Sequence, residues 1–136
     1  MDVQALADEI DIGNLLTTYC RAVDSKDWEL YRSLLTDDAH LNYSAAGLFV
    51  GGPDDAVAYL TRHQESISVG MHHVTNLESR VDGDAATVVA MWFNAVALPD
   101  ADGTFCTRFV HGRWHDDMVK TPSGWRIQNL RLEVAA

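Results

Sequence analysis

The sequence predicts an α+β fold, a barrel-like domain in which N-terminal helices pack on one face of a curved antiparallel sheet. Apolar residues recur at helical spacing in the first half of the chain, and four long β-rich runs follow one another in the second half. The 136 residues, of which 47% are hydrophobic, are enough for one domain with its own core, spanning 1–136.

Three helices are expected in the first half. The first covers residues 3–23 and ends near Asp24, the second repeats helically from Trp28 until residues 36–38 stop it, and the third begins at Pro53. A short extended segment, residues 39–43, should separate the second helix from the third. The buried stripe of the first helix comprises Leu6, Ile10, Ile12, Leu16, Tyr19, Cys20 and Val23. The apolar positions expected in the third are Val57, Tyr59, Leu60 and Ile67.

Four strands are expected at residues 71–81, 85–98, 104–119 and 125–134, and turn-forming residues separate them into an antiparallel meander. The second of these strands is apolar on both faces. One face carries Val89, Met91 and Phe93, and the other carries Val88, Trp92, Val96 and Leu98. One face can meet the helices and enclose a pocket, while the opposite face requires a cover. We therefore expect a homodimer or homotrimer.

Charge and composition exclude several classes of function. The formal net charge of -10 argues against a nucleic-acid partner, because phosphate binding depends on clustered Lys and Arg. No apolar run approaches the roughly 20 residues that cross a bilayer, and the N-terminus lacks the pattern of a signal peptide. We therefore expect a cytoplasmic protein with no membrane partner.

The sequence also predicts that no cofactor or metal is needed. Cys20 and Cys106 lack a second Cys or His at metal spacing, so buried free thiols are the better interpretation. His111, Arg113 and His115 alternate along one strand face, but the Arg between the two histidines disfavours a metal site. The chain contains no Gly-rich phosphate loop and no nucleophile elbow.

Asp24 and His72 are the residues best placed for acid/base chemistry. Asp24 lies at the border of the first buried stripe and at the C-terminal end of its helix, where an aspartate would by itself more often cap the next helix. His72 and His73 open the first long strand and must point to opposite faces. Whichever faces the pocket can act as a base when its imidazole is neutral. Candidate substrate contacts are Tyr19, Trp28, Phe93, His111 and Arg131, and Tyr43 is a candidate donor.

The chain resembles the SnoaL-like branch of the nuclear transport factor 2 superfamily over nearly its whole length. The resemblance rests on residues 19–28 (Tyr-Cys-Arg-Ala-Val-Asp-Ser-Lys-Asp-Trp), 71–76 (Met-His-His-Val-Thr-Asn), 112–114 (Gly-Arg-Trp) and 124–127 (Gly-Trp-Arg-Ile). It implies a cone-shaped α+β barrel. Within these segments, residues 24–28 (Asp-Ser-Lys-Asp-Trp) are similar to scytalone dehydratase, and residues 72–76 are similar to hexachlorocyclohexane dehydrochlorinase.

The resemblance implies roles for three residues. In both relatives an aspartate at the place of Asp24 orients a histidine at the place of His72, and that histidine removes a proton during elimination. Tyr43 falls where scytalone dehydratase has a tyrosine that polarises the substrate carbonyl. Three positions depart from these relatives: Val23 replaces a second pocket tyrosine, no histidine stands near Val96, where scytalone dehydratase has another catalytic one, and Leu130 stands where many relatives have an arginine, with Arg131 one residue later.

The function that the resemblance implies is a cofactor-independent lyase of the dehydratase type. Its Asp-His pair would act on a small hydrophobic substrate that is cyclic or aromatic. Two alternatives remain open at this point: a polyketide or steroid isomerase or cyclase with the same pair, and a non-catalytic ligand-binding protein or aromatic-ring dioxygenase β subunit.

Overall fold

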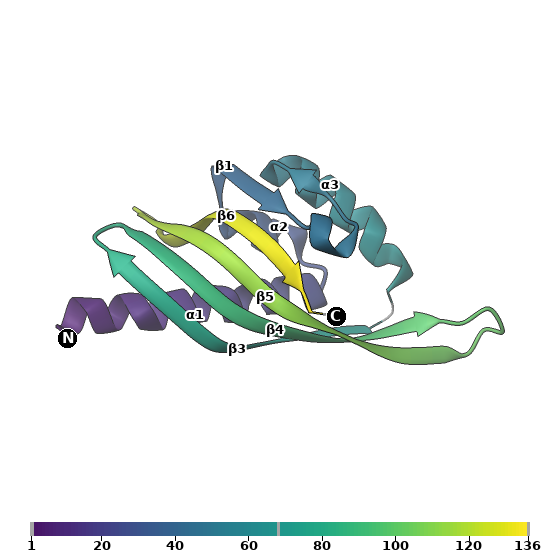
Figure 1. The fold of residues 1–136 in the computed structure, drawn as a ribbon. Coiled ribbons are helices and arrows are strands. Elements are labelled where there is room, and N and C mark those ends of the chain that lie inside the picture. The colour runs from purple at the N-terminus through teal and green to yellow at the C-terminus, as the bar shows by residue number, and fades with distance from the viewer. Residues whose placement is uncertain (1, 68, 136) are drawn as a thin grey trace.

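The computed structural model describes residues 2–67 and 69–135, which form an α+β fold with helices packed against a curved six-stranded sheet (Figure 1). The predicted fold class is confirmed. The helical elements in chain order are α1 (Val3–Asp24), α2 (Trp28–Ser33), η1 (Ser44–Ala46), α3 (Pro53–His63) and η2 (Gln64–Ser66). The strands are β1 (Leu35–Asn42), β2 (Val50–Gly51), β3 (Val69–Asp82), β4 (Ala85–Pro99), β5 (Phe105–Thr121) and β6 (Gly124–Val134).

Helix α1 has the boundaries that its sequence predicts. The Asp2 side chain caps its start by accepting a hydrogen bond of 2.7 Å from the backbone N–H of Ala5. At its end, Lys26 adopts a left-handed φ of 57°, which turns the chain towards α2. Within the described ranges, no helix combines the length and the apolar character needed to cross a membrane.

Helix α2 is shorter than predicted, because the chain becomes a strand at Leu35. Leu34 and Leu35 continue the helical apolar spacing, but Leu35 pairs with Ile127 of β6, and the backbone N–H of Ile127 donates to the carbonyl of Leu34 at 2.9 Å. Pairing with a distant strand therefore overrides the local pattern. Similarly, α3 ends at His63, so Ile67, expected in that helix, lies beyond both α3 and η2.

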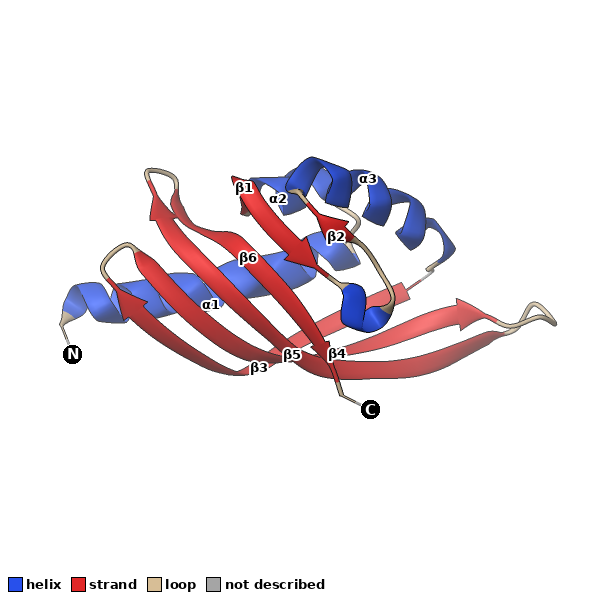
Figure 2. Cartoon of the chain, turned by 45° about the horizontal axis from the view of Figure 1, so that its top comes forward, coloured by secondary structure: helices blue, strands red, loops and turns tan. Residues whose placement is uncertain are grey.

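The sheet has the order β2-β1-β6-β5-β4-β3. Strands β3 to β6 form the predicted antiparallel meander, whereas β1 joins the sheet parallel to β6 and makes it mixed. The sheet was expected to be antiparallel throughout. It differs because the connection from β1 to β6 spans most of the chain, which allows parallel pairing. Figure 2 shows that β4 and β5 continue past the other strands.

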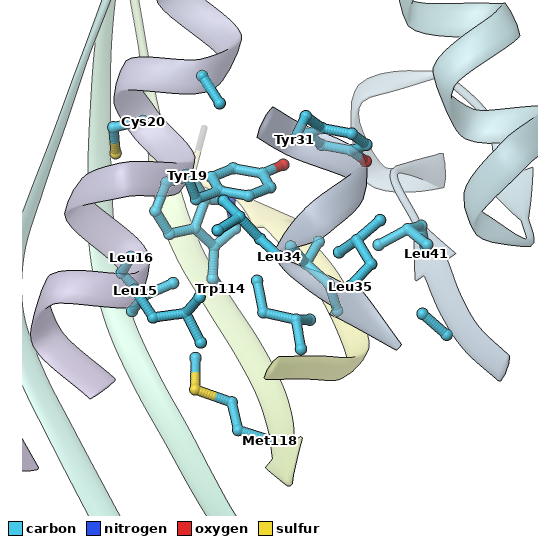
Figure 3. Packing of buried hydrophobic residues seen from close by; sticks show 14 of the residues in the cluster. Leu15, Leu16, Tyr19, Cys20, Tyr31, Leu34, Leu35, Leu41, Trp114 and Met118 are labelled. Atoms are coloured by element: carbon cyan, nitrogen blue, oxygen red, sulfur yellow. The ribbon is translucent and has the colours of Figure 1, made fainter. Parts of the chain in front are cut away.

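The core lies between the helices and the concave face of the sheet (Figure 3). Alternate residues of β4 and β5, such as Trp92 and Trp114, point inward and are buried. Met91 and Phe93 belong to the opposite face of β4 and remain exposed. The convex face is therefore apolar but lies outside the helix-covered core, and the concave face can enclose a ligand.

Candidate active site

Asp24 and His72 lie in direct contact, although 48 positions separate them in the chain. Oδ1 of Asp24 is 2.6 Å from Nδ1 of His72, and Oδ2 accepts a hydrogen bond of 2.8 Å from the backbone N–H of His72. Their side chains are only 23% and 15% exposed. The two side chains therefore share one partly buried environment, at the distance that an acid/base pair requires.

The contact between Asp24 and His72 arises because the end of α1 lies beside the start of β3. Asp24 is the last residue of α1, and His72 lies near the start of β3, which packs beside that helix. Strand alternation turns His72 inward, whereas the exposed His73 points to the outer face and contacts the ring of Phe93 at 5.9 Å between centroids. Of the two neighbouring histidines, only His72 faces the helices.

His72 forms part of the wall of a cavity of about 520 Å³ between the helices and the concave sheet face. Most of the wall is apolar, including Val23, Leu48, Leu60, Trp92, Val96 and Trp114. Polar side chains also line it: Tyr19, Tyr43, His63, Gln64, Ser66, Asn94 and Arg108. A cavity of this size suits a small ligand held largely by apolar contact.

Three tyrosine hydroxyls form a chain beside the cavity. The hydroxyl oxygen of Tyr43 is 2.7 Å from that of Tyr19 and 2.8 Å from that of Tyr31. Burial raises the pKa of all three hydroxyls well above their ordinary value, so they stay protonated at neutral pH. Tyr19 and Tyr43 reach the cavity wall, while Tyr31 is fully buried behind them. The cavity therefore has hydroxyl donors in addition to His72.

Asp116 is a buried acid that the sequence analysis did not single out. It is 3% exposed, and neither of its carboxyl oxygens has a hydrogen-bond partner among the described residues. Burial, followed by the charge of Asp117, raises the pKa of Asp116 well above its ordinary value. The available signal was its position between Trp114 and Met118 on the inward face of β5. Burial without a partner therefore favours the neutral form of this carboxyl group.

The structure does not bring every predicted contact residue to the cavity. Phe93, His111 and Arg131 are exposed on the outward-facing positions of β4, β5 and β6, and Trp28 is half-buried against Tyr31, with ring centroids 5.8 Å apart. These four residues lie outside the lining of the cavity, and strand alternation turns three of them to the outer face. Tyr19, Tyr43 and His72 do line the cavity.

The polar row on β5 has a local explanation. Nε2 of His115 is 3.0 Å from Oε2 of Glu133, and a guanidinium nitrogen of Arg113 is 3.7 Å from the same oxygen. This is a cross-strand charged cluster on the sheet. Over residues 2–67 and 69–135, no group of three or more His, Cys, Asp and Glu side chains converges in a way that could hold a metal ion.

The model of the SnoaL-like domain matches residues 4–131. The chain belongs to the SnoaL-like family. A relative from Mycobacterium tuberculosis, an uncharacterised protein, is 31% identical over 130 residues, which cover 93% of this chain and 85% of the relative. The resemblance inferred from the sequence motifs is thereby confirmed at the level of the family.

Solved structures share the fold of this SnoaL-like chain. A protein from Kribbella flavida has a TM-score of 0.87 and 26% identity, with 97% of this chain and 93% of that one covered. A candidate scytalone dehydratase from Novosphingobium aromaticivorans has a TM-score of 0.88 and 19% identity, covering 100% and 89%. A hexachlorocyclohexane dehydrochlorinase has a TM-score of 0.86 and 18% identity, covering 100% and 90%. At these identities the last two likenesses concern the fold alone.

Proposed function

We propose that this protein is a cofactor-independent lyase of the dehydratase type, in which His72 removes a proton from carbon and Asp24 holds His72 in place. The observation that carries the proposal is the double contact between the Asp24 carboxylate and His72, at 2.6 Å to the ring and 2.8 Å to the backbone, in the wall of an apolar cavity. The dehydratase and dehydrochlorinase that share the fold are named for elimination reactions.

The contact defines which ring nitrogen acts. A carboxylate can only accept, so Nδ1 of His72 carries the hydrogen in this pair, and Nε2 is left with a free lone pair. Nε2 would take the substrate proton, and the Asp24 carboxylate would stabilise the imidazolium that forms. Returning that proton to a departing hydroxyl group would release water and complete the elimination. General base catalysis of this kind contributes about 10²–10⁴-fold.

The tyrosine hydroxyls would stabilise the negative charge that develops on a substrate carbonyl. Tyr31 is fully buried, and its hydroxyl contacts only that of Tyr43 among the described residues, so Tyr31 donates to Tyr43. A hydroxyl proton from Tyr43 or Tyr19 is then left to point into the cavity. A pre-placed donor of this kind lowers the barrier because it requires no reorganisation during the reaction.

The cavity wall suggests the type of substrate. The rings of Trp92 and Trp114 stack at 6.2 Å between centroids, and that of His72 stacks on Trp114 at 6.5 Å. Flat aromatic walls favour a small hydrophobic molecule that is cyclic or aromatic. The same pair would support an isomerase if the abstracted proton returned to another carbon and no group departed.

The proposal is tested by incubating purified protein with a panel of cyclic β-hydroxy ketones and following the conjugated alkene by absorbance. His72→Ala should abolish turnover, and His73→Ala, which changes the outward-facing neighbour, should leave it intact. With cyclic β,γ-unsaturated ketones in the same assay, a product of unchanged mass with the double bond moved into conjugation would indicate the isomerase. Ligand binding without turnover in the wild type would contradict the lyase and favour a binding protein.

A further inference from the structure

The charge inside the cavity is opposite to that of the whole chain. The protein contains 20 Asp and Glu residues against ten Lys and Arg, yet none of the described residues that line the cavity is acidic. The lining includes the cationic side chain of Arg108. A cavity with this lining offers an anion a favourable site on a protein whose overall charge would repel it.

Arg108 is the only Arg or Lys among the described lining residues, and it lies on β5 opposite Val96 of β4, beyond the end of the pairing of β5 with β6 at Gly112. It lies on the inward-facing positions of β5 with Val110 and Trp114, and it is exposed. Within the described ranges no carboxylate lies within 4.0 Å of its guanidinium group. Arg113, another arginine of β5, instead forms an ion pair with Glu133 at 3.7 Å.

The sheet register sets the distance between Arg108 and His72. His72 pairs with Asn94, Arg108 pairs with Val96, and Asn94 and Val96 are two residues apart on β4. With strands about 4.8 Å apart and a rise of about 3.4 Å per residue, the Cα atoms of His72 and Arg108 are about 12 Å apart. Both side chains face the same cavity, so one small molecule can reach both.

We propose that Arg108 binds the carboxylate of the substrate, which makes the ligand an aromatic or alicyclic carboxylic acid. The apolar body of such an acid would lie against Trp92 and Trp114, with its reacting carbon at His72 and its carboxylate at the guanidinium group. Arginine is suited to this role because its planar donors match two carboxylate oxygens. The inference rests on the proposed function for the placement of the reacting carbon, but the binding of the acid does not require turnover.

The test uses 2-naphthoate and its neutral isostere 2-naphthamide, which differ in charge but hardly in shape. Affinities are measured by isothermal titration calorimetry, and the indole N–H signals of Trp92 and Trp114 in NMR spectra report binding in the cavity. Wild type should bind the acid at least about tenfold more tightly than the amide, since a charge-assisted hydrogen bond is worth that much or more. Arg108→Met should remove the preference, and Arg108→Lys should keep part of it.

Arg131→Met is the matched control, because Arg131 is an exposed strand arginine outside the cavity lining and its replacement removes the same charge. This variant should keep the full preference for the acid. Equal affinities of wild type for the two probes, an equal loss in Arg108→Met and Arg131→Met, or no binding of the acid at millimolar concentration would each overturn the proposal. If the wild-type protein binds the acid preferentially but turns over no substrate, that result would support the anion site. It would contradict only the proposal that the protein is a lyase.

Discussion

The carboxylate of Asp24 contacts His72 twice, through the ring nitrogen at 2.6 Å and through the backbone N–H at 2.8 Å. The backbone contact fixes the carboxylate at the start of β3, and the ring contact then fixes the orientation of the imidazole. A shift of the end of α1 relative to β3 would break both. The carboxylate therefore orients the imidazole, and it would also stabilise the imidazolium that forms on proton transfer.

Asp24→Asn should lower turnover by about 10²–10⁴-fold, because an amide cannot stabilise the imidazolium and can present a donor to Nδ1. Asp11→Asn, a change of the same chemistry at an exposed position of α1, should leave the rate unchanged. Steady-state kinetics on any turned-over substrate, with circular dichroism as the folding control, checks this. Equal rates for Asp24→Asn and Asp11→Asn would contradict a role of Asp24 in catalysis and favour a helix-capping role.

Tyr43→Phe should lower kcat by about 10²–10³-fold, the usual effect of removing one donor to a developing oxyanion. Tyr31→Phe removes a hydroxyl that contacts Tyr43 but does not line the cavity, so its effect on kcat should be smaller. The comparison of kcat in the two variants decides whether Tyr43 itself donates to the substrate or only supports another donor. A larger loss in Tyr31→Phe than in Tyr43→Phe would contradict the donor role of Tyr43.

Asp116 should make the protein less stable as the pH rises. Its raised pKa keeps the folded-state carboxyl group protonated, whereas the unfolded chain loses this proton above about pH 4. The folded state then binds one more proton, so the free energy of unfolding falls by about 1.4 kcal/mol per pH unit between the ordinary and the raised pKa.

Asp116→Asn replaces the titrating carboxyl group with a neutral amide. It should therefore abolish this contribution to the pH dependence of the free energy of unfolding. The variant should gain stability relative to wild type as the pH rises from 4 to 7, and the two should differ least near pH 3. Urea unfolding at a series of pH values measures the effect. Parallel stability curves for the two proteins would show that Asp116 is ionised in the folded state.

The convex sheet face should join copies of this chain into a homodimer or homotrimer. Phe105 and Phe109 are 62% and 64% exposed there, and the ring of Phe109 stacks on Phe93 at 5.4 Å between centroids. Phe109→Lys should dissociate the oligomer, while Leu6→Lys, at an exposed apolar position of α1, should not. Light scattering at micromolar concentration is the measurement, and a monomeric wild type would contradict the prediction.

Local patterns in the sequence predicted most of the fold. The boundaries of α1 and the four long strands follow from apolar spacing and turn residues, which are properties of neighbouring positions. The start of β1 at Leu35 could not be predicted in this way, because it depends on pairing with Ile127, 92 positions later. Element boundaries that are set by distant partners leave little trace in local sequence.

The candidate site could be predicted only in part, because it too depends on contacts between distant parts of the chain. The family motifs pointed to Asp24, His72 and Tyr43, and the structure places Asp24 against His72 and places Tyr43 in the wall of the cavity that His72 lines. Strand alternation alone did not say which face of β4 and β5 is concave, so Phe93 was expected in the cavity and Arg108 was not. The face is decided by the packing of the helices, which no single strand encodes.

Deuterium exchange tests most directly whether His72 removes a proton from carbon. The α-hydrogens of 2-tetralone, a flat cyclic ketone, can be followed by NMR in D₂O with wild type, His72→Ala and the matched variant His73→Ala. Wild type and His73→Ala should incorporate deuterium at equal rates, and His72→Ala should not exceed the rate without protein. Exchange in folded His72→Ala at the wild-type rate would contradict the account.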